Sequence, residues 1–204
     1  MGDIKTEQWF DSLKQELESA YIRHEEPWKQ SGFSGPEDRW RALRKPIADC
    51  IDKSGSFLDI GCANAYLLEC IMKWTGKRGI TVAPFGIDLS EKLIELAKDR
   101  LPDYSDNLVV GNGWDWSSRQ KYDYVRTELV YVPDPLQEQY IKRIIDTYLG
   151  YEGKLLVALY RNSTTPVDSP WDDVKVKGWG LEITGQVSGY WDSRELTRVL
   201  VISK

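Results

Sequence analysis

The chain has 204 residues, of which 41% are hydrophobic and 12% aromatic, and its formal net charge is −5. This composition is typical of a folded domain with a sizeable core, and it excludes an intrinsically disordered chain. The acidic balance and the lack of a long basic run make duplex nucleic acid a poor partner. No apolar stretch approaches the 18 residues that a membrane span needs.

The cysteines and the first residues bear on location. Cys50, Cys62 and Cys70 are odd in number, lack paired C-x-x-C spacing, and are accompanied by a single histidine. We therefore expect no metal site. The first ten residues carry an acid at position 3 and no apolar segment typical of a signal peptide. Together these features favour a reducing, cytoplasmic setting.

Two helical patterns open the chain. Apolar side chains recur every four residues from Trp9 to Tyr21, which predicts an amphipathic helix over residues 4–26. A polar break follows, and Pro36 then begins a second helix that ends near Gly55. The aromatic residues of this region suit a lid over a pocket. We expect residues 1–35 to be an N-terminal helical extension or lid, and residues 36–204 to form the main domain.

Strand and helix patterns alternate in the main domain. Strands are predicted at 57–60, 84–90, 107–116, 122–132 and 153–161, and helices at 66–74, 91–101 and 136–149. Such alternation predicts a parallel sheet with helices on both faces. The strand patterns at 181–191 and 196–204 are too close for a parallel crossover and must form an antiparallel hairpin. The predicted fold class is α/β, a doubly wound, mostly parallel seven-stranded sheet with a C-terminal antiparallel hairpin and N-terminal capping helices.

Residues 59–65 read DIGCANA and join the first strand to a helix through small residues. Such a turn leaves helix N–H groups free and lets a ligand approach the backbone. Asp59 repels a pyrophosphate but suits a ligand with a cationic amine. Asp88 ends the second strand, and Ser90 stands in position to cap the next helix. These features indicate a nucleotide-sized site for a cationic ligand.

The order and spacing of these elements resemble the class I S-adenosylmethionine-dependent methyltransferases, and the resemblance covers residues 36–204. The first motif of that family is typically (D/E)-x-G-x-G-x-G, and Ala63 and Ala65 replace its second and third glycines here. Alanine keeps the close approach provided that neither position needs a positive φ. The resemblance implies S-adenosyl-L-methionine as cofactor and methyl transfer to an oxygen or nitrogen of a small molecule.

The resemblance also implies a cofactor site at the ends of the first four strands. Its residues are Asp59, Gly61, Ala63, Asp88, Leu89, Asn112, Gly113, Trp114, Asp115 and Glu128. By this resemblance Asp59 and the Gly61 backbone would hold the methionine end, and Asp88 the two ribose hydroxyls. Leu89 and Trp114 would cover the adenine, whose amino group would bond to the residue at 112 or 115. Asn112 and Asp115 are also turn-forming types that often bond only their own backbone.

Two residues are candidates for a general base. Glu128 would line the junction of cofactor and acceptor, but a glutamate near Arg126 also suits a simple ion pair at the strand end. His24 is the only imidazole, and its place after the first helix also suits a helix cap. The basic cluster Arg39, Arg41, Arg44 and Lys45 is either a solvated helix face or a grip on an anionic substrate.

Two other functions are compatible with the sequence. A non-catalytic binding or regulatory module would keep the cofactor fold, because the acceptor half of the site carries no signature. An NAD-dependent oxidoreductase is less compatible, because its fingerprint G-x-G-x-x-G needs a small residue where Tyr66 stands. Residues 162–180 take the place of a clean helix before the hairpin, and we expect them to line the acceptor pocket.

Overall fold

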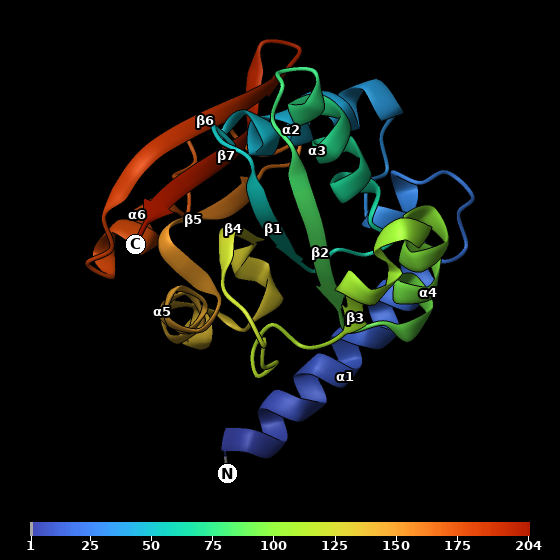
Figure 1. Cartoon of the computed structure of the whole chain (residues 1–204). Helices are drawn as coiled ribbons and strands as arrows, with labels where there is room; N and C mark the ends of the chain where they lie inside the picture. Colours follow the sequence, from blue (N-terminus) through green and yellow to red (C-terminus); the bar gives the residue numbers. More distant parts are fainter. Residues whose placement is uncertain (1) are drawn as a thin grey trace.

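The computed structural model of the protein describes residues 2–204 and has a seven-stranded sheet at its centre (Figure 1). The strand order is β3-β2-β1-β4-β5-β7-β6. The strands are β1 (Gly55–Ile60), β2 (Val82–Asp88), β3 (Leu108–Val110), β4 (Tyr122–Thr127), β5 (Leu149–Tyr160), β6 (Ile183–Trp191) and β7 (Arg194–Ser203). The first five strands are parallel, and β7 pairs antiparallel with both β5 and β6. The predicted fold class is confirmed.

Helices cover both faces of the sheet. They are α1 (Gly2–Tyr21), α2 (Glu37–Asp49), α3 (Tyr66–Gly76), α4 (Glu91–Arg100), α5 (Gln137–Thr147) and α6 (Asp173–Gly178). Short 3₁₀ turns lie between them: η1 (Lys29–Ser31), η2 (Pro102–Asn107), η3 (Leu129–Tyr131) and η4 (Asp134–Leu136). None of the helices described in residues 2–204 has the length and apolar character that a membrane span requires.

Alternating strand residues divide the core into two clusters. Phe57 on β1 packs into one cluster with side chains of α2, α3 and α4, and its neighbour Leu58 packs into the other with α5. Successive strand side chains point to opposite faces, so a fully buried strand is apolar on both. Trp40, Leu43 and Ile47, spaced three and four residues apart on α2, are all buried and form the face of the helix that packs on the core.

Several element boundaries differ from the prediction. The first helix ends at Tyr21 rather than at residue 26, and the second ends at Asp49 rather than near Gly55. The third strand stops at Val110, because the Asn112 side chain accepts a hydrogen bond from the Trp114 N–H (2.9 Å) and turns the chain away from the sheet.

Two further boundaries differ in the second half of the chain. The fourth strand ends at Thr127 rather than at residue 132, and η3 begins two residues after that end. The fifth strand starts at Leu149, four residues before the predicted start at 153. Residues 162–180 are not entirely irregular, since they contain the short helix α6.

Candidate functional site

A cavity of about 450 Å³ lies over the carboxyl ends of the parallel strands. This volume is within the range of small-molecule pockets, and the location is the usual one in open α/β sheets. Its floor comes from the ends of β1, β2, β4 and β5, and from the turn after β3. Its opposite wall comes from α1, residues 31–35 and α2. The predicted extension therefore contributes directly to the cavity.

The loop between β1 and α3 takes a left-handed backbone at three positions. The φ angles are +74° at Gly61, +47° at Ala63 and +58° at Ala65. The condition under which alanine was expected to replace glycine without strain is therefore not met. A left-handed residue with a Cβ costs roughly 1–2 kcal/mol, so the loop is held in place by its surroundings.

This loop is held by contacts with strand β2 and with the ring of Tyr131. The N–H groups of Gly61 and Cys62 both donate to the Ile87 carbonyl of β2, at 2.8 and 3.0 Å. A Cβ added at Gly61 would lie 2.6 Å from the Tyr131 ring. Glycine is thus required at position 61 for two reasons: its φ angle is positive, and the Tyr131 ring leaves no room for a side chain.

Asp88 at the end of β2 is buried and bonded to the same loop. Its Oδ2 accepts from the Ala63 N–H (2.9 Å), and its Oδ1 accepts from the Ser90 N–H (3.0 Å). Burial raises the pKa of Asp88 above its ordinary value, and the two backbone N–H groups act against that rise. Ser90 also caps α4 by accepting from the Leu93 N–H, which confirms the predicted cap.

Asp59 at the end of β1 forms a buried ion pair with Arg126 of β4. The two side chains are 1% and 3% exposed, and Arg126 Nη1 donates to Asp59 Oδ1 at 3.2 Å. Asp59 Oδ2 is buried and has no hydrogen-bond partner among the described residues. Burial raises the pKa of Asp59 to about 7, even though the Arg126 charge acts to lower it.

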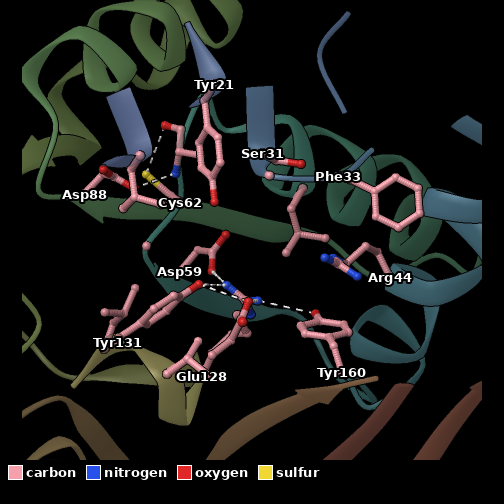
Figure 2. Close-up of a pocket in the computed structure, with 18 of the residues that line it drawn as sticks. Tyr21, Ser31, Phe33, Arg44, Asp59, Cys62, Asp88, Glu128, Tyr131 and Tyr160 are labelled. Atoms are coloured by element: carbon pink, nitrogen blue, oxygen red, sulfur yellow. Dashed lines mark hydrogen bonds and ion pairs between the residues drawn. The ribbon is translucent and has the colours of Figure 1, made fainter. Parts of the chain in front are cut away.

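Arg126 connects Asp59 to three more side chains on the cavity floor (Figure 2). It donates to Glu128 Oε1, to the Tyr131 hydroxyl (2.9 Å) and to the Tyr160 hydroxyl (3.3 Å). The Tyr131 hydroxyl in turn donates to Glu128 Oε1 at 3.0 Å. The ion pair considered for Glu128 is therefore present, and Glu128 also lines the cavity. Sequence reasoning missed Tyr131 and Tyr160, which no motif marks.

The predicted adenine-binding segment is only partly in the cavity wall. The lining residues there are Leu89, Gly111, Asn112, Gly113 and Trp114, whereas Asp115 is not among them. The Asn112 carbonyl oxygen is already bonded to its own turn. Gly113 is required by packing, because a Cβ there would lie 2.6 Å from Ile60.

His24, like Asp115, does not line the cavity. Its Nε2 lies 3.4 Å from Arg23 Nε, and its carbonyl accepts from Gln30 Nε2 at 2.6 Å. The structure thus separates His24 from Glu128, the other candidate base. Among residues 6–204, no group of three or more His, Cys, Asp and Glu side chains is arranged to hold a metal ion.

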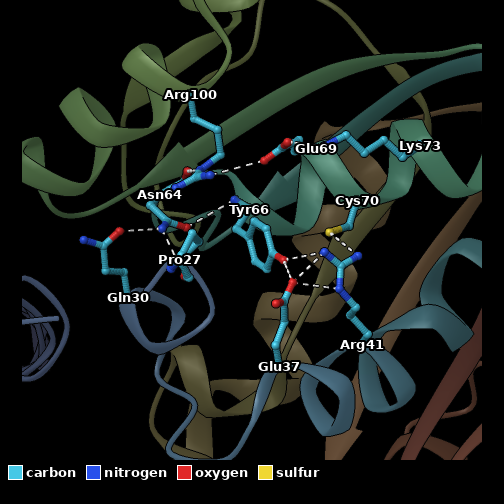
Figure 3. A network of polar contacts seen from close by, with 10 residues as sticks. All are labelled: Pro27, Gln30, Glu37, Arg41, Asn64, Tyr66, Glu69, Cys70, Lys73 and Arg100. Carbon is cyan, nitrogen blue, oxygen red and sulfur yellow. Dashed lines mark hydrogen bonds and ion pairs between the residues drawn. The ribbon is translucent and has the colours of Figure 1, made fainter. Parts of the chain in front are cut away.

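Residues 18–30, near the N-terminus, are hydrogen-bonded to the β1–α3 loop and to the start of α4 after β2. Asn64, fully buried in the β1–α3 loop, donates to the Pro27 carbonyl (3.1 Å) and to Gln30 Oε1 (2.8 Å), as Figure 3 shows. At the other loop, Glu18 of α1 accepts from Ser90 Oγ (2.8 Å) and pairs with Lys92 (3.0 Å). The side chains of Tyr21, Ser31 and Phe33 lie on the cavity wall opposite Asp59 (Figure 2).

Comparison with known proteins adds structural relatives only. No protein-family model and no curated protein matches the sequence. The N-methyltransferase NodS from Bradyrhizobium japonicum WM9, in complex with S-adenosyl-L-homocysteine, matches with a TM-score of 0.61 and 16% identity over 94% of this chain and 97% of that one. Magnesium protoporphyrin IX methyltransferase (ChlM) from Synechocystis PCC 6803, with bound SAM, matches with a TM-score of 0.64 and 14% identity over 96% of each chain.

A third match is a TehB-like SAM-dependent methyltransferase from Corynebacterium glutamicum ATCC 13032 Kitasato. Its TM-score is 0.54, with 21% identity over 82% of this chain and 95% of that one. At such identities the likeness establishes the arrangement of the backbone. The chain has the fold of the class I S-adenosylmethionine-dependent methyltransferases.

Proposed function

We propose that the protein is an S-adenosylmethionine-dependent methyltransferase that acts on an oxygen or nitrogen of a small molecule. The observation that carries this proposal is Asp59 Oδ2, a buried carboxylate oxygen without a partner at the end of β1. A buried polar atom needs a partner, and the α-ammonium of the cofactor supplies one. The small-residue loop beside it admits the rest of the ligand.

The site residues divide the work of binding and orientation. S-Adenosylmethionine supplies an electrophilic methyl group on a sulfonium when bound. Arg126 fixes the positions of Asp59 and Glu128, so the two carboxylates face the cavity without rotating freely. Leu89 and Trp114 provide apolar walls, and Leu13, Leu17 and Tyr21 of α1 line the cavity, where they would limit access of water to the reacting atoms. Much of the rate of a displacement comes from such positioning.

Glu128 is the group best placed to meet the acceptor. Its Oε1 is shared by Arg126 and Tyr131, which leaves Oε2 as the oxygen that can accept a hydrogen bond from an acceptor O–H or N–H. His24 has no part in the proposal, because it lies outside the cavity.

The structure gives less support to the alternative function, an NAD-dependent oxidoreductase. Tyr66, at the position that needs a small residue, is buried and stacks on Trp40 with 4.7 Å between ring centroids. A non-catalytic cofactor-binding module differs from an enzyme only in turnover.

Calorimetric titration with S-adenosylhomocysteine and with NAD tests the proposal. We expect binding of the first and none of the second. Asp88→Ala should lose about 1.5–3 kcal/mol of S-adenosylhomocysteine affinity, the range for hydrogen bonds to charged groups. Asp103→Ala, at an exposed acid of η2, is the matched control and should bind normally. Unchanged binding by Asp88→Ala would contradict the site. Methyl transfer to an acceptor separates an enzyme from a binding module.

A further inference from the structure

The charges around the cavity are segregated by strand. Asp59 and Asp88 lie at the ends of β1 and β2, where the cofactor is proposed to bind. On the β4–β5 half, Glu128 is neutralised by Arg126. The remaining charged residues that line that half are cationic and come from Arg39 and Arg44 of α2 and from Arg161 just after β5. The half of the cavity left for the acceptor therefore carries an excess of positive charge.

Arg44 is a half-buried member of that cationic group. Its guanidinium stacks on the Tyr160 ring at 3.8 Å and lies 5.9 Å from the centre of the Phe33 ring. In Figure 2 its nitrogen atoms point toward the middle of the cavity, across from Asp59. Among residues 6–204, no carboxylate lies within ion-pair distance of the Arg44 guanidinium, and no hydrogen bond engages its side-chain N–H groups. Stacking orients a guanidinium while leaving its N–H donors free for an anion.

Of the other members of the basic cluster, Arg41 and Lys45 are already paired, and Arg39 approaches the same Phe33 ring as Arg44, at 5.6 Å from its centre. Arg41 pairs with Glu37 and donates to the Tyr66 hydroxyl (Figure 3), and Lys45 pairs with Asp49. Arg39 lines the cavity, and its buried Nε has no partner among the described residues. A buried N–H without a partner is uncommon and indicates a missing acceptor group. Two of the four cluster residues thus face the cavity with donors to spare.

We infer, resting on the function proposed above, that the methyl acceptor carries a carboxylate or phosphate, and that Arg44, with Arg39 beside it, binds that anion. The ring faces of Phe33 and Tyr160 and the side chain of Leu43 make the surrounding walls apolar. A small aromatic or aliphatic acid fits this combination of charge and wall. A neutral alcohol or an amine without an acidic group does not.

The carboxylate of the cofactor itself is the other possible source of an anion. Tyr160, on which Arg44 stacks, ends β5, two strands away from β1 in the sheet order. Asp59 and its unpartnered oxygen mark the methionine end at β1. Arg126 lies between the two, since its Nη1 donates to Asp59 and its Nη2 to the Tyr160 hydroxyl, so the stack is on the far side of Arg126 from Asp59, where we place the acceptor.

Binding to the protein saturated with S-adenosylhomocysteine tests the inference, with benzoate and phenyl phosphate as probes and benzamide as the neutral match. We expect the anions to bind and benzamide to bind at least tenfold more weakly. Arg44→Gln should weaken phenyl phosphate binding tenfold or more and change S-adenosylhomocysteine affinity less than twofold. Arg41→Gln, on the same helix, is the control and should leave phenyl phosphate binding unchanged.

Arg44→Lys keeps the charge but loses the planar fork, so it should weaken phenyl phosphate at least threefold in a folded protein. No loss in either Arg44 variant, or equal binding of benzoate and benzamide, would overturn the inference. A loss of S-adenosylhomocysteine affinity in Arg44→Gln, with unchanged affinity for 5′-methylthioadenosine, would assign the anion to the cofactor and also overturn it. Failure of the wild type to bind S-adenosylhomocysteine would instead refute the proposed function.

Discussion

The ion pair of Asp59 and Arg126 has one partner at the end of β1 and the other in the neighbouring strand β4. Buried ion pairs add little net stability, because desolvation of both charges offsets their attraction. Removal of one partner is costly, since it leaves the other charge buried and alone. The pair here is also incomplete, with Asp59 Oδ2 unbonded. We interpret it as a means of holding a carboxylate in place for a cationic ligand.

The raised pKa of Asp59 predicts how binding depends on pH. Because burial lifts the folded pKa to about 7 from an ordinary value of 3.8, the stability linked to this group is fully present below pH 3.8 and is lost as pH rises through 7. Cofactor affinity runs the other way, since the ammonium needs the ionised carboxylate. We expect S-adenosylhomocysteine affinity, measured by calorimetry, to rise about tenfold between pH 6 and pH 8.

Two controls isolate Asp59 in that experiment. 5′-Methylthioadenosine lacks the ammonium and should bind equally at both pH values, and so should S-adenosylhomocysteine to the Asp59→Asn variant. His24→Gln should keep the pH dependence, because His24 lies outside the cavity. A pH dependence that persists in Asp59→Asn would assign the titration to another group.

At the scale of elements, the β1–α3 connection is a strained part of the fold. Ala63 and Ala65 both adopt positive φ, and both are buried. Their methyl groups differ in surroundings, since Ala63 lines the cavity whereas Ala65 is completely enclosed in the core beneath α3. The two positions should therefore respond differently to glycine.

Ala63→Gly should raise the free energy of unfolding by up to about 1.5 kcal/mol. Relief of the left-handed backbone is worth roughly 1–2 kcal/mol, and the greater freedom of glycine in the unfolded chain removes about 0.4–1 kcal/mol. Ala65→Gly also loses a packed methyl worth about 0.8 kcal/mol, so its net effect should be close to zero. Urea unfolding followed by tryptophan fluorescence measures both changes.

The matched control is Ala42→Gly in the interior of α2, where glycine should cost about 1 kcal/mol. A loss of stability in Ala63→Gly as large as that of the control would show that the positive φ at this position is not strained.

At the scale of the molecule, the sequence predicts the layers of sheet and helices, but it does not predict which side chains meet on the floor of the cavity. Buried parallel strands are apolar runs, so the sequence locates β1 and β2 within two residues and β4 within five. The N-terminal part of β5, at residues 149–153, reads LGYEG and has no such pattern. The pairing of Asp59 with Arg126 joins residues 67 positions apart, and only the strand order brings them together.

The cavity is lined by α1, α2, the ends of β1, β2, β4 and β5, and the turn after β3. A ligand bound there contacts elements from most of the chain, so its binding stabilises the fold as a whole. A ligand that binds only the folded state at 100 times its Kd adds about 2.7 kcal/mol. For a chain of this size, we expect S-adenosylhomocysteine at that concentration to raise Tm by roughly 5–11 °C. Differential scanning calorimetry measures this shift.

5′-Methylthioadenosine at 100 times its own Kd should give a similar shift, because mass action depends only on that ratio, and NAD should give none. An unchanged Tm with S-adenosylhomocysteine would contradict a cofactor site in the folded protein.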